Sequence, residues 1–182
     1  MNFTRRPASI EDEAFVRQLI LQMVSDDLGA ALWPEAMRAP LLEMQYRGRL
    51  DSIRVNWPDA EQEIILTDGQ PAGWVVIAHC EDAIHLVEIA ILPEHRGKGV
   101  GTGRIRELLT ESDRTGKPVR LNVLTTNPAN RLYERLGFRR TGGDEIRHFM
   151  ERPSGAAPPG RRRASARRAA PKRGGRPEGL PH

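Results

Sequence analysis

The sequence is short of cysteine, of long apolar runs and of metal-ligand patterns, and each shortage excludes a class of protein. The one cysteine, Cys80, cannot form an intramolecular disulfide, and no apolar segment typical of a signal peptide follows the first methionine, so we expect a cytoplasmic protein. No run reaches the roughly eighteen apolar residues of a membrane span, so no membrane contact is expected. The histidines lack a ligand spacing such as H-E-x-x-H, and we expect no metal.

Positive charge is concentrated at one end of the chain. The whole chain carries a net +4, and residues 153–182 supply eight basic residues against one acidic residue, a net +7 that leaves −3 for residues 1–152. Because this end is rich in Pro, Gly, Ala and Arg, it cannot bury enough apolar surface to fold. We therefore predict one domain at 1–152 and a disordered basic tail at 153–182. No aromatic residue interleaves with the tail arginines, so nucleic-acid binding is not expected.

Hydrophobic periodicity predicts an α/β (α+β) fold in which helices cover both faces of one mixed sheet. Ser9 has the pattern of a helix N-cap, with Asp12 at the capping-box position, and Asp68-Gly69 is a strong turn pair between two strands. The expected strands are 3–6, 63–67, 72–80, 83–92, 119–124, 138–141 and 145–150. The expected helices are 10–28, 35–53, 99–115 and 129–136.

The segment 84–109, IHLVEIAILPEHRGKGVGTGRIRELL, joins a strand to an amphipathic helix through a glycine-rich turn. The first N–H groups of a helix lack partners within it and attract anions. Gly97, Gly99 and Gly101 leave these N–H groups free of Cβ atoms, which favours phosphate binding over a turn that serves packing alone. Neither the P-loop pattern nor the dinucleotide fingerprint fits these residues.

Two blocks of the sequence together resemble the GCN5-related N-acetyltransferase (GNAT) family. Arg96, Gly99 and Gly101 match its motif of Gln or Arg followed by x-x-Gly-x-Gly or Ala, and residues 127–138, NPANRLYERLGF, resemble a second block. The resemblance extends over residues 3–152. It implies a mostly antiparallel sheet whose fourth and fifth strands splay apart to admit acetyl-CoA.

The resemblance also implies which residues contact this cosubstrate. Backbone amides of the glycine loop would hold the pyrophosphate, the fourth strand would hydrogen-bond the pantetheine arm as an added strand would, and an asparagine after the fifth strand would assist. Asn127 is the first choice for that asparagine and Asn130 the second, although both could be helix caps. The expected contacts are Ile89, Ala90, Ile91, Arg96, Gly97, Lys98, Gly99, Val100, Gly101, Thr102, Asn127 and Asn130.

Two residues are candidates for acid–base catalysis. Glu88 is the one charge in the apolar run 86–92, so it should face a cleft or a partner, either as a general base or in a structural ion pair. Tyr133 lies in the second block, where the resemblance implies the acid that protonates the leaving thiolate; core packing is the alternative. The fifth-strand position at which some relatives carry a glutamate is Asn122. That difference leaves the base role to Glu88 or to water.

These observations predict an enzyme that moves an acetyl group from acetyl-CoA to a primary amine by direct transfer in a ternary complex. The alternative is a noncatalytic acyl-CoA-binding module that contacts nucleic acid through its basic tail. The acceptor is either a small-molecule amine or a protein amino group. The sequence leaves open whether the protein forms a homodimer. Residues that could form an aromatic wall of the acceptor site, or equally part of the core, are Trp33, Met44, Tyr46 and Trp57.

Overall fold

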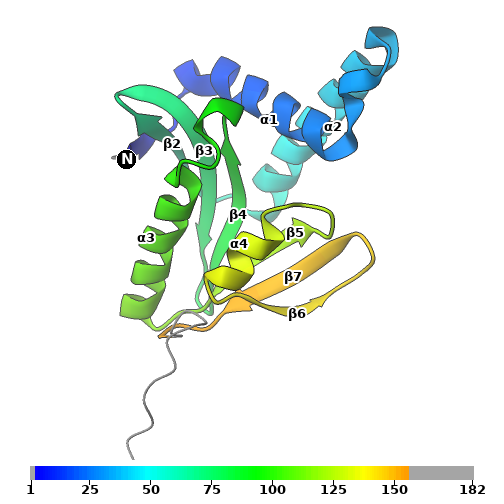
Figure 1. Cartoon of the computed structure of the whole chain (residues 1–182). Helices are drawn as coiled ribbons and strands as arrows, with labels where there is room; N and C mark the ends of the chain where they lie inside the picture. Colours follow the sequence, from blue (N-terminus) through cyan, green and yellow to red (C-terminus); the bar gives the residue numbers. More distant parts are fainter. Residues whose placement is uncertain (1–2, 156–182) are drawn as a thin grey trace, which may run out of the picture.

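Seven strands form one open sheet in the computed structural model, which describes residues 3–155 (Figure 1). The strands are β1 (Phe3–Pro7), β2 (Glu61–Thr67), β3 (Gln70–His79), β4 (Ile84–Ile91), β5 (Val119–Leu124), β6 (Arg139–Gly143) and β7 (Arg147–Arg152). The helices are α1 (Glu13–Leu28), α2 (Glu35–Asn56), α3 (Val100–Thr115) and α4 (Asn130–Arg135), and short 3-10 turns occupy Ile10–Asp12, Ala30–Leu32 and Pro93–His95. The predicted fold class is confirmed.

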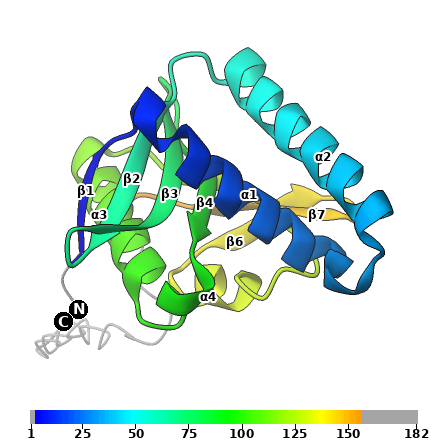
Figure 2. The same cartoon turned by 90° about the horizontal axis from the view of Figure 1, so that it is seen from above.

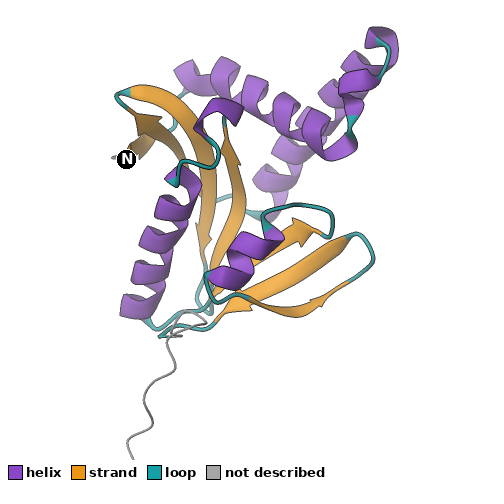
Figure 3. Ribbon diagram, viewed as in Figure 1, coloured by secondary structure: helices purple, strands orange, loops and turns teal. Residues whose placement is uncertain are grey.

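The sheet is antiparallel except at its centre. The strand order is β1-β2-β3-β4-β5-β7-β6, and the parallel pair is β4 with β5. That pairing covers three residues of each strand and ends at Leu86 and Leu121, although both strands continue beyond it. The two strands then diverge (Figure 3), which confirms the predicted splaying.

Alternation along the strands divides the buried side chains into two cores. On one face, residues such as Ile65 and Val75 pack with α3 and α4. On the other face, residues such as Ile64 and Trp74 pack with α1 and α2. Figure 2 shows α1 passing over the sheet, with α2 beyond it. Helices therefore cover both faces, and the divergence of β4 and β5 lies between them.

The last strand differs most from its predicted position. Strand β7 begins at Arg147 instead of 145, because the Asp144 side chain accepts hydrogen bonds from the backbone N–H groups of Ile146 (2.8 Å) and Arg147 (2.7 Å) and closes a turn there. Beyond the predicted domain end at 152, the Ser154 hydroxyl donates to the Gly116 carbonyl at 2.9 Å. The rest of the predicted tail, residues 156–182, lies outside the described part of the chain.

The predicted capping arrangement at Ser9 is confirmed in a modified form. The chain enters a 3-10 turn before α1, and the Ser9 backbone N–H donates to Asp12 Oδ2 at 2.8 Å. Arg6 donates to both Asp12 oxygens, each at 2.7 Å. These hydrogen bonds hold the pKa of the buried Asp12 carboxyl well below its usual range. Asp12 therefore connects β1 to the beginning of α1.

We predict that Asp12→Ala lowers the free energy of unfolding by about 1–2 kcal/mol at neutral pH, the usual effect of losing a helix cap with its hydrogen bonds. Because folding lowers the pKa of Asp12, its stabilisation is complete above the unfolded-state pKa near 4 and is lost as the pH falls below it. Urea unfolding at several pH values measures the difference. Asp51→Ala, which removes an exposed ion pair on α2, should change stability by less than about 0.5 kcal/mol. Equal losses in both variants would contradict the assignment.

Candidate functional site

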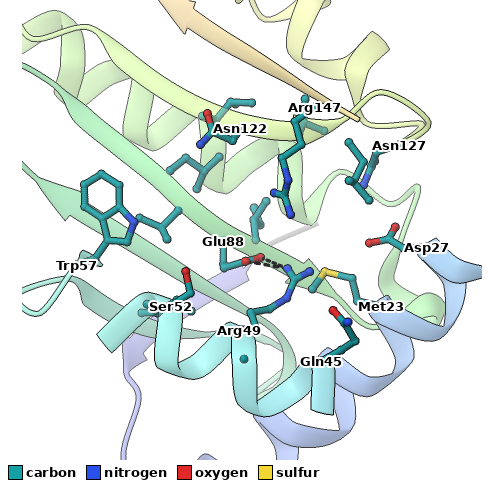
Figure 4. Close-up of a pocket in the computed structure, with 18 of the residues that line it drawn as sticks. Met23, Asp27, Gln45, Arg49, Ser52, Trp57, Glu88, Asn122, Asn127 and Arg147 are labelled. Carbon is teal, nitrogen blue, oxygen red and sulfur yellow. Dashed lines mark hydrogen bonds and ion pairs between the residues drawn. The ribbon is translucent and has the colours of Figure 1, made fainter. Parts of the chain in front are cut away.

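A cavity of about 550 Å³ lies at the divergence of β4 and β5 (Figure 4). Its lining comes from α1, α2, β4, β5, the segment after β5, α4 and the start of β7. Four charged residues contribute to it, namely Asp27, Arg49, Glu88 and Arg147. The cavity is therefore an open, polar site built from elements that are far apart in the sequence.

Glu88 faces both a partner and the cavity. Arg49 Nη1 donates to its two carboxylate oxygens at 2.7 and 2.8 Å, and the Glu88 side chain is 17% exposed. Burial raises the pKa of Glu88, and the positive charge of Arg49 opposes that shift. A bulge in β4 at Val87 interrupts the alternation beside it, so that residues 86–89 all line the cavity. Glu88 is thus a largely buried carboxylate that a molecule in the cavity could contact.

Tyr133 reaches the same cavity from α4. Burial and the negative charge of Glu88 raise the pKa of Tyr133 to about 12. Its ring packs edge-on against Phe138, with the centroids 5.6 Å apart. The phenol is therefore protonated at neutral pH and can serve as a proton donor inside the cavity, although the ring also belongs to the core.

The two candidate asparagines have different surroundings. Asn127 lines the cavity, and its side-chain oxygen accepts a hydrogen bond from the Ala129 backbone N–H at 2.8 Å. Asn130 Nδ2 donates to the backbone carbonyls of Leu124 (2.8 Å) and Asn127 (2.7 Å), and its oxygen lies 3.2 Å from His148 Nδ1. The Asn130 side chain therefore holds the turn between β5 and α4 together.

The glycine-rich loop has the geometry of an anion site. Gly97 (φ +71°) and Gly99 (φ +86°) adopt the left-handed backbone conformation, which residues other than glycine rarely adopt. The Gly103 N–H donates to the Gly99 carbonyl at 2.8 Å as the first bond of α3. The N–H groups of Val100, Gly101 and Thr102 precede that bond at the positive end of the helix dipole. A phosphate fits this arrangement.

Arg96 connects the loop to its surroundings. Its Nε donates to the Ile91 carbonyl at 2.8 Å, and its Nη1 lies 2.7 Å from Asp26 Oδ2 on α1. The guanidinium thus fixes the loop between β4 and α1. Lys98 is exposed beside the loop.

The three β4 residues predicted to meet the pantetheine arm differ in environment. Ile89 lines the cavity, Ala90 is buried in the core below α1, and the Ile91 carbonyl already accepts the bond from Arg96. Within residues 3–155, the β4 edge that faces β5 has no strand partner after Leu86. That edge can accept an extended ligand.

Comparisons with known proteins agree with this geometry. Residues 60–140 match the model of the acetyltransferase (GNAT) domain. This segment belongs to the GNAT family of acetyltransferase domains. The GNAT fold also appears in solved structures: the PaiA N-acetyltransferase of Thermoplasma acidophilum in complex with coenzyme A is 19% identical, with a TM-score of 0.65 over 84% of this chain and 99% of that one.

Two further structures show the same GNAT fold. An acetyltransferase of Thermus thermophilus is 19% identical, with a TM-score of 0.62 over 84% of this chain and 97% of that one. The histone acetyltransferase HPA2 and related acetyltransferase of Corynebacterium glutamicum is 18% identical, with a TM-score of 0.61 over 86% of this chain and 99% of that one. At such identities, the likeness shows the fold alone.

Sequence reasoning missed three charged residues of this GNAT cavity, namely Asp27, Arg49 and Arg147. A signal existed for one of them: residues 45, 48, 49, 52 and 53 of α2 line the cavity with the spacing of a single helical face. From the expected aromatic wall, Met44 and Trp57 line the cavity, Tyr46 is buried in the core and Trp33 does neither. Asn122 contributes from β5.

Two general findings concern the described residues of this GNAT protein. No helix within residues 3–155 is long and apolar enough to cross a membrane. In the same part of the chain, no three His, Cys, Asp or Glu side chains gather as metal ligands would.

We predict that the Tyr133 phenol of folded protein ionises only near pH 12. Ultraviolet titration of Tyr46→Phe, which leaves Tyr133 as the single tyrosine, measures this directly. Adding Glu88→Gln to Tyr46→Phe should lower the pKa of Tyr133, because it removes a negative charge that disfavours the phenolate. Adding Glu81→Gln, at an exposed position, should leave it unchanged. Ionisation of the folded protein near the ordinary value of about 10 would contradict the buried placement.

Proposed function

We propose that the protein transfers an acetyl group from acetyl-CoA to a primary amine directly, within a ternary complex. The observation that carries this proposal is the unpaired edge of β4, which leads from the cavity at Glu88 toward the glycine loop before α3. Acetyl-CoA is elongated, with a pyrophosphate near one end and a thioester at the other. One such molecule along this edge would present phosphate to the loop and the thioester to the cavity.

Each part of the donor then has protein groups of matching chemistry. Backbone N–H groups from Gly97 through Thr102 would hold the pyrophosphate, with Lys98 adding positive charge. Backbone groups of residues 89–91 on the β4 edge that faces β5, other than the Ile91 carbonyl bonded by Arg96, would hydrogen-bond the pantetheine arm, and Asn127 would contact it from the opposite side. Arg96 would act by fixing the loop, because Asp26 and the Ile91 carbonyl occupy its guanidinium.

Glu88 and Tyr133 would manage the two protons of the reaction. The amine nitrogen forms a bond to the acetyl carbon while the carbon–sulfur bond breaks; the amine loses a proton and the sulfur gains one. A buried carboxylate with a raised pKa suits the role of base, directly or through a water molecule. The protonated phenol of Tyr133 would supply the proton to sulfur.

The placement of the two groups couples their proton transfers. The pKa of Tyr133, about 12, lies above that of a free thiol, about 8.5, so proton donation from the phenol to the thiolate is unfavourable while Glu88 is charged. Part of that elevation comes from the negative charge of Glu88. Once Glu88 has accepted the amine proton it is neutral, and the phenol becomes a stronger acid. Deprotonation of the amine therefore favours protonation of the thiolate.

The test is a panel of amines and peptides incubated with acetyl-CoA, with release of free thiol as the signal. We expect Tyr133→Phe to lower kcat by about tenfold or more, within the usual effect of a general acid, while the Kd for acetyl-CoA stays close to that of the unaltered protein. Arg139→Gln, at an exposed position on β6, is the control and should not change kcat. Binding of acetyl-CoA without thiol release from any amine would instead support a noncatalytic acyl-CoA-binding module.

Two glycines that flank α3 allow a matched test of the loop. Gly99 (φ +86°) precedes the helix and Gly116 (φ +75°) follows it, so alanine strains both positions in the same way. Calorimetry should show that Gly99→Ala binds coenzyme A about tenfold or more weakly, because the strained loop must shift the N–H groups that would hold the pyrophosphate. Gly116→Ala should lose similar stability yet keep its affinity. Equal affinities in the two variants would place the pyrophosphate elsewhere.

A further inference from the structure

Arg147 enters the cavity with a guanidinium that acts on the neighbouring carboxylates only through its charge. Its backbone is fixed, since its N–H donates to Asp144 Oδ1 at 2.7 Å and the residue pairs with Leu124 on β5. Its guanidinium forms no hydrogen bond or ion pair with any residue in the range 3–155. Figure 4 shows the side chain extending from the start of β7 toward Glu88 and Arg49. A cation thus extends into the cavity from a fixed backbone position, and within residues 3–155 no hydrogen bond or ion pair occupies its donors.

The other charged residues of the cavity determine which charges a ligand should carry. Arg49 is ion-paired with Glu88, which leaves Asp27 and Arg147 as one anion and one cation with no side-chain hydrogen bond or ion pair among the described residues. Burial raises the pKa of Asp27, and the positive charges of Arg49 and Arg147 oppose that rise. The cavity therefore offers separate places to a positive and a negative group of one ligand.

This inference rests on the proposed acetyl transfer. We propose that the acceptor is an amine that also carries an oxyanion, a carboxylate or a phosphate, which the guanidinium of Arg147 binds while the amine faces Glu88. A guanidinium presents planar paired donors that match the two oxygens of such a group. Asp27, on α1, would attract the ammonium end of the same molecule as it enters. A zwitterionic amine, such as a free amino acid, has this charge pattern.

Arg147 distinguishes a free amino acid from a peptide amino terminus. In a peptide, the first carboxyl group is part of a neutral amide, so the oxyanion near the amine is missing. The protein would accordingly prefer free amino acids, or amines with a phosphate at a similar distance, over peptides and over the corresponding neutral amines. The two sources of the oxyanion differ in size and charge, and the experiment separates them.

The experiment measures kcat/KM for matched acceptors with saturating acetyl-CoA. Amino acids are compared with their amides and with the decarboxylated amines, and aminoalkyl phosphates with the corresponding amino alcohols. For the unaltered protein, we expect a preference of about tenfold or more for the oxyanion-bearing member of at least one set, since a charged hydrogen-bonded contact contributes on that order. Arg147→Gln should reduce that ratio to about one, mainly through KM. Arg147→Lys should keep part of it, and Arg139→Gln, on the neighbouring strand, should keep all of it.

Two kinetic outcomes would overturn the inference, and a binding measurement decides the case in which no acceptor reacts. Amides and neutral amines that react as fast as the acids would leave acetyl transfer intact and remove the role of the oxyanion. A rise in the KM for acetyl-CoA in Arg147→Gln, with the acceptor ratio preserved, would assign Arg147 to the donor. If no acceptor releases thiol, the binding of amino acids and aminoalkyl phosphates to the protein is measured by calorimetry. Binding that Arg147→Gln abolishes would support the ligand class although acetyl transfer fails. Absence of binding would reject both the ligand class and acetyl transfer.

Discussion

The early end of pairing between β4 and β5 is the constraint on which the site depends. Had the two strands continued side by side past Leu86 and Leu121, their backbone groups would have bonded to each other and side chains would have closed the gap. Because they separate, β4 keeps a free edge, and a cavity opens between the helices of the two faces. The same divergence brings Tyr133 and Glu88, from opposite sides of the gap, to a common space.

The ion pair between Arg49 and Glu88 is the second determinant of the site. An isolated buried carboxylate would take up a proton, whereas a fully neutralised one would have little basicity. In this cavity, burial raises the pKa of Glu88 and the positive charge of Arg49 opposes the rise. A charged group that binds beside Glu88 would therefore shift its pKa further. The pair also joins α2, whose residues line the cavity, to the centre of the sheet at the proposed base.

The sequence predicted what depends on local chemistry. The glycine loop, the lone charge at Glu88 and the position of Tyr133 are contained in two short segments, and the structure brings Glu88 and Tyr133 to one cavity. Asp27, Arg49 and Arg147 could not be predicted in the same way, because they come from α1, α2 and β7 and meet only after packing. The start of β7 was misplaced for a different reason: the Asp144 side chain accepts the backbone N–H groups of residues 146 and 147 and closes a local turn there.

The most direct test of this account is a crystal structure of the protein with acetyl-CoA bound. The account predicts that the pyrophosphate contacts backbone N–H groups between Gly97 and Thr102, that the pantetheine arm follows the free edge of β4, and that the sulfur lies in the cavity near Tyr133 and Glu88. A donor bound away from the β4 edge, or a sulfur atom remote from both side chains, would contradict it.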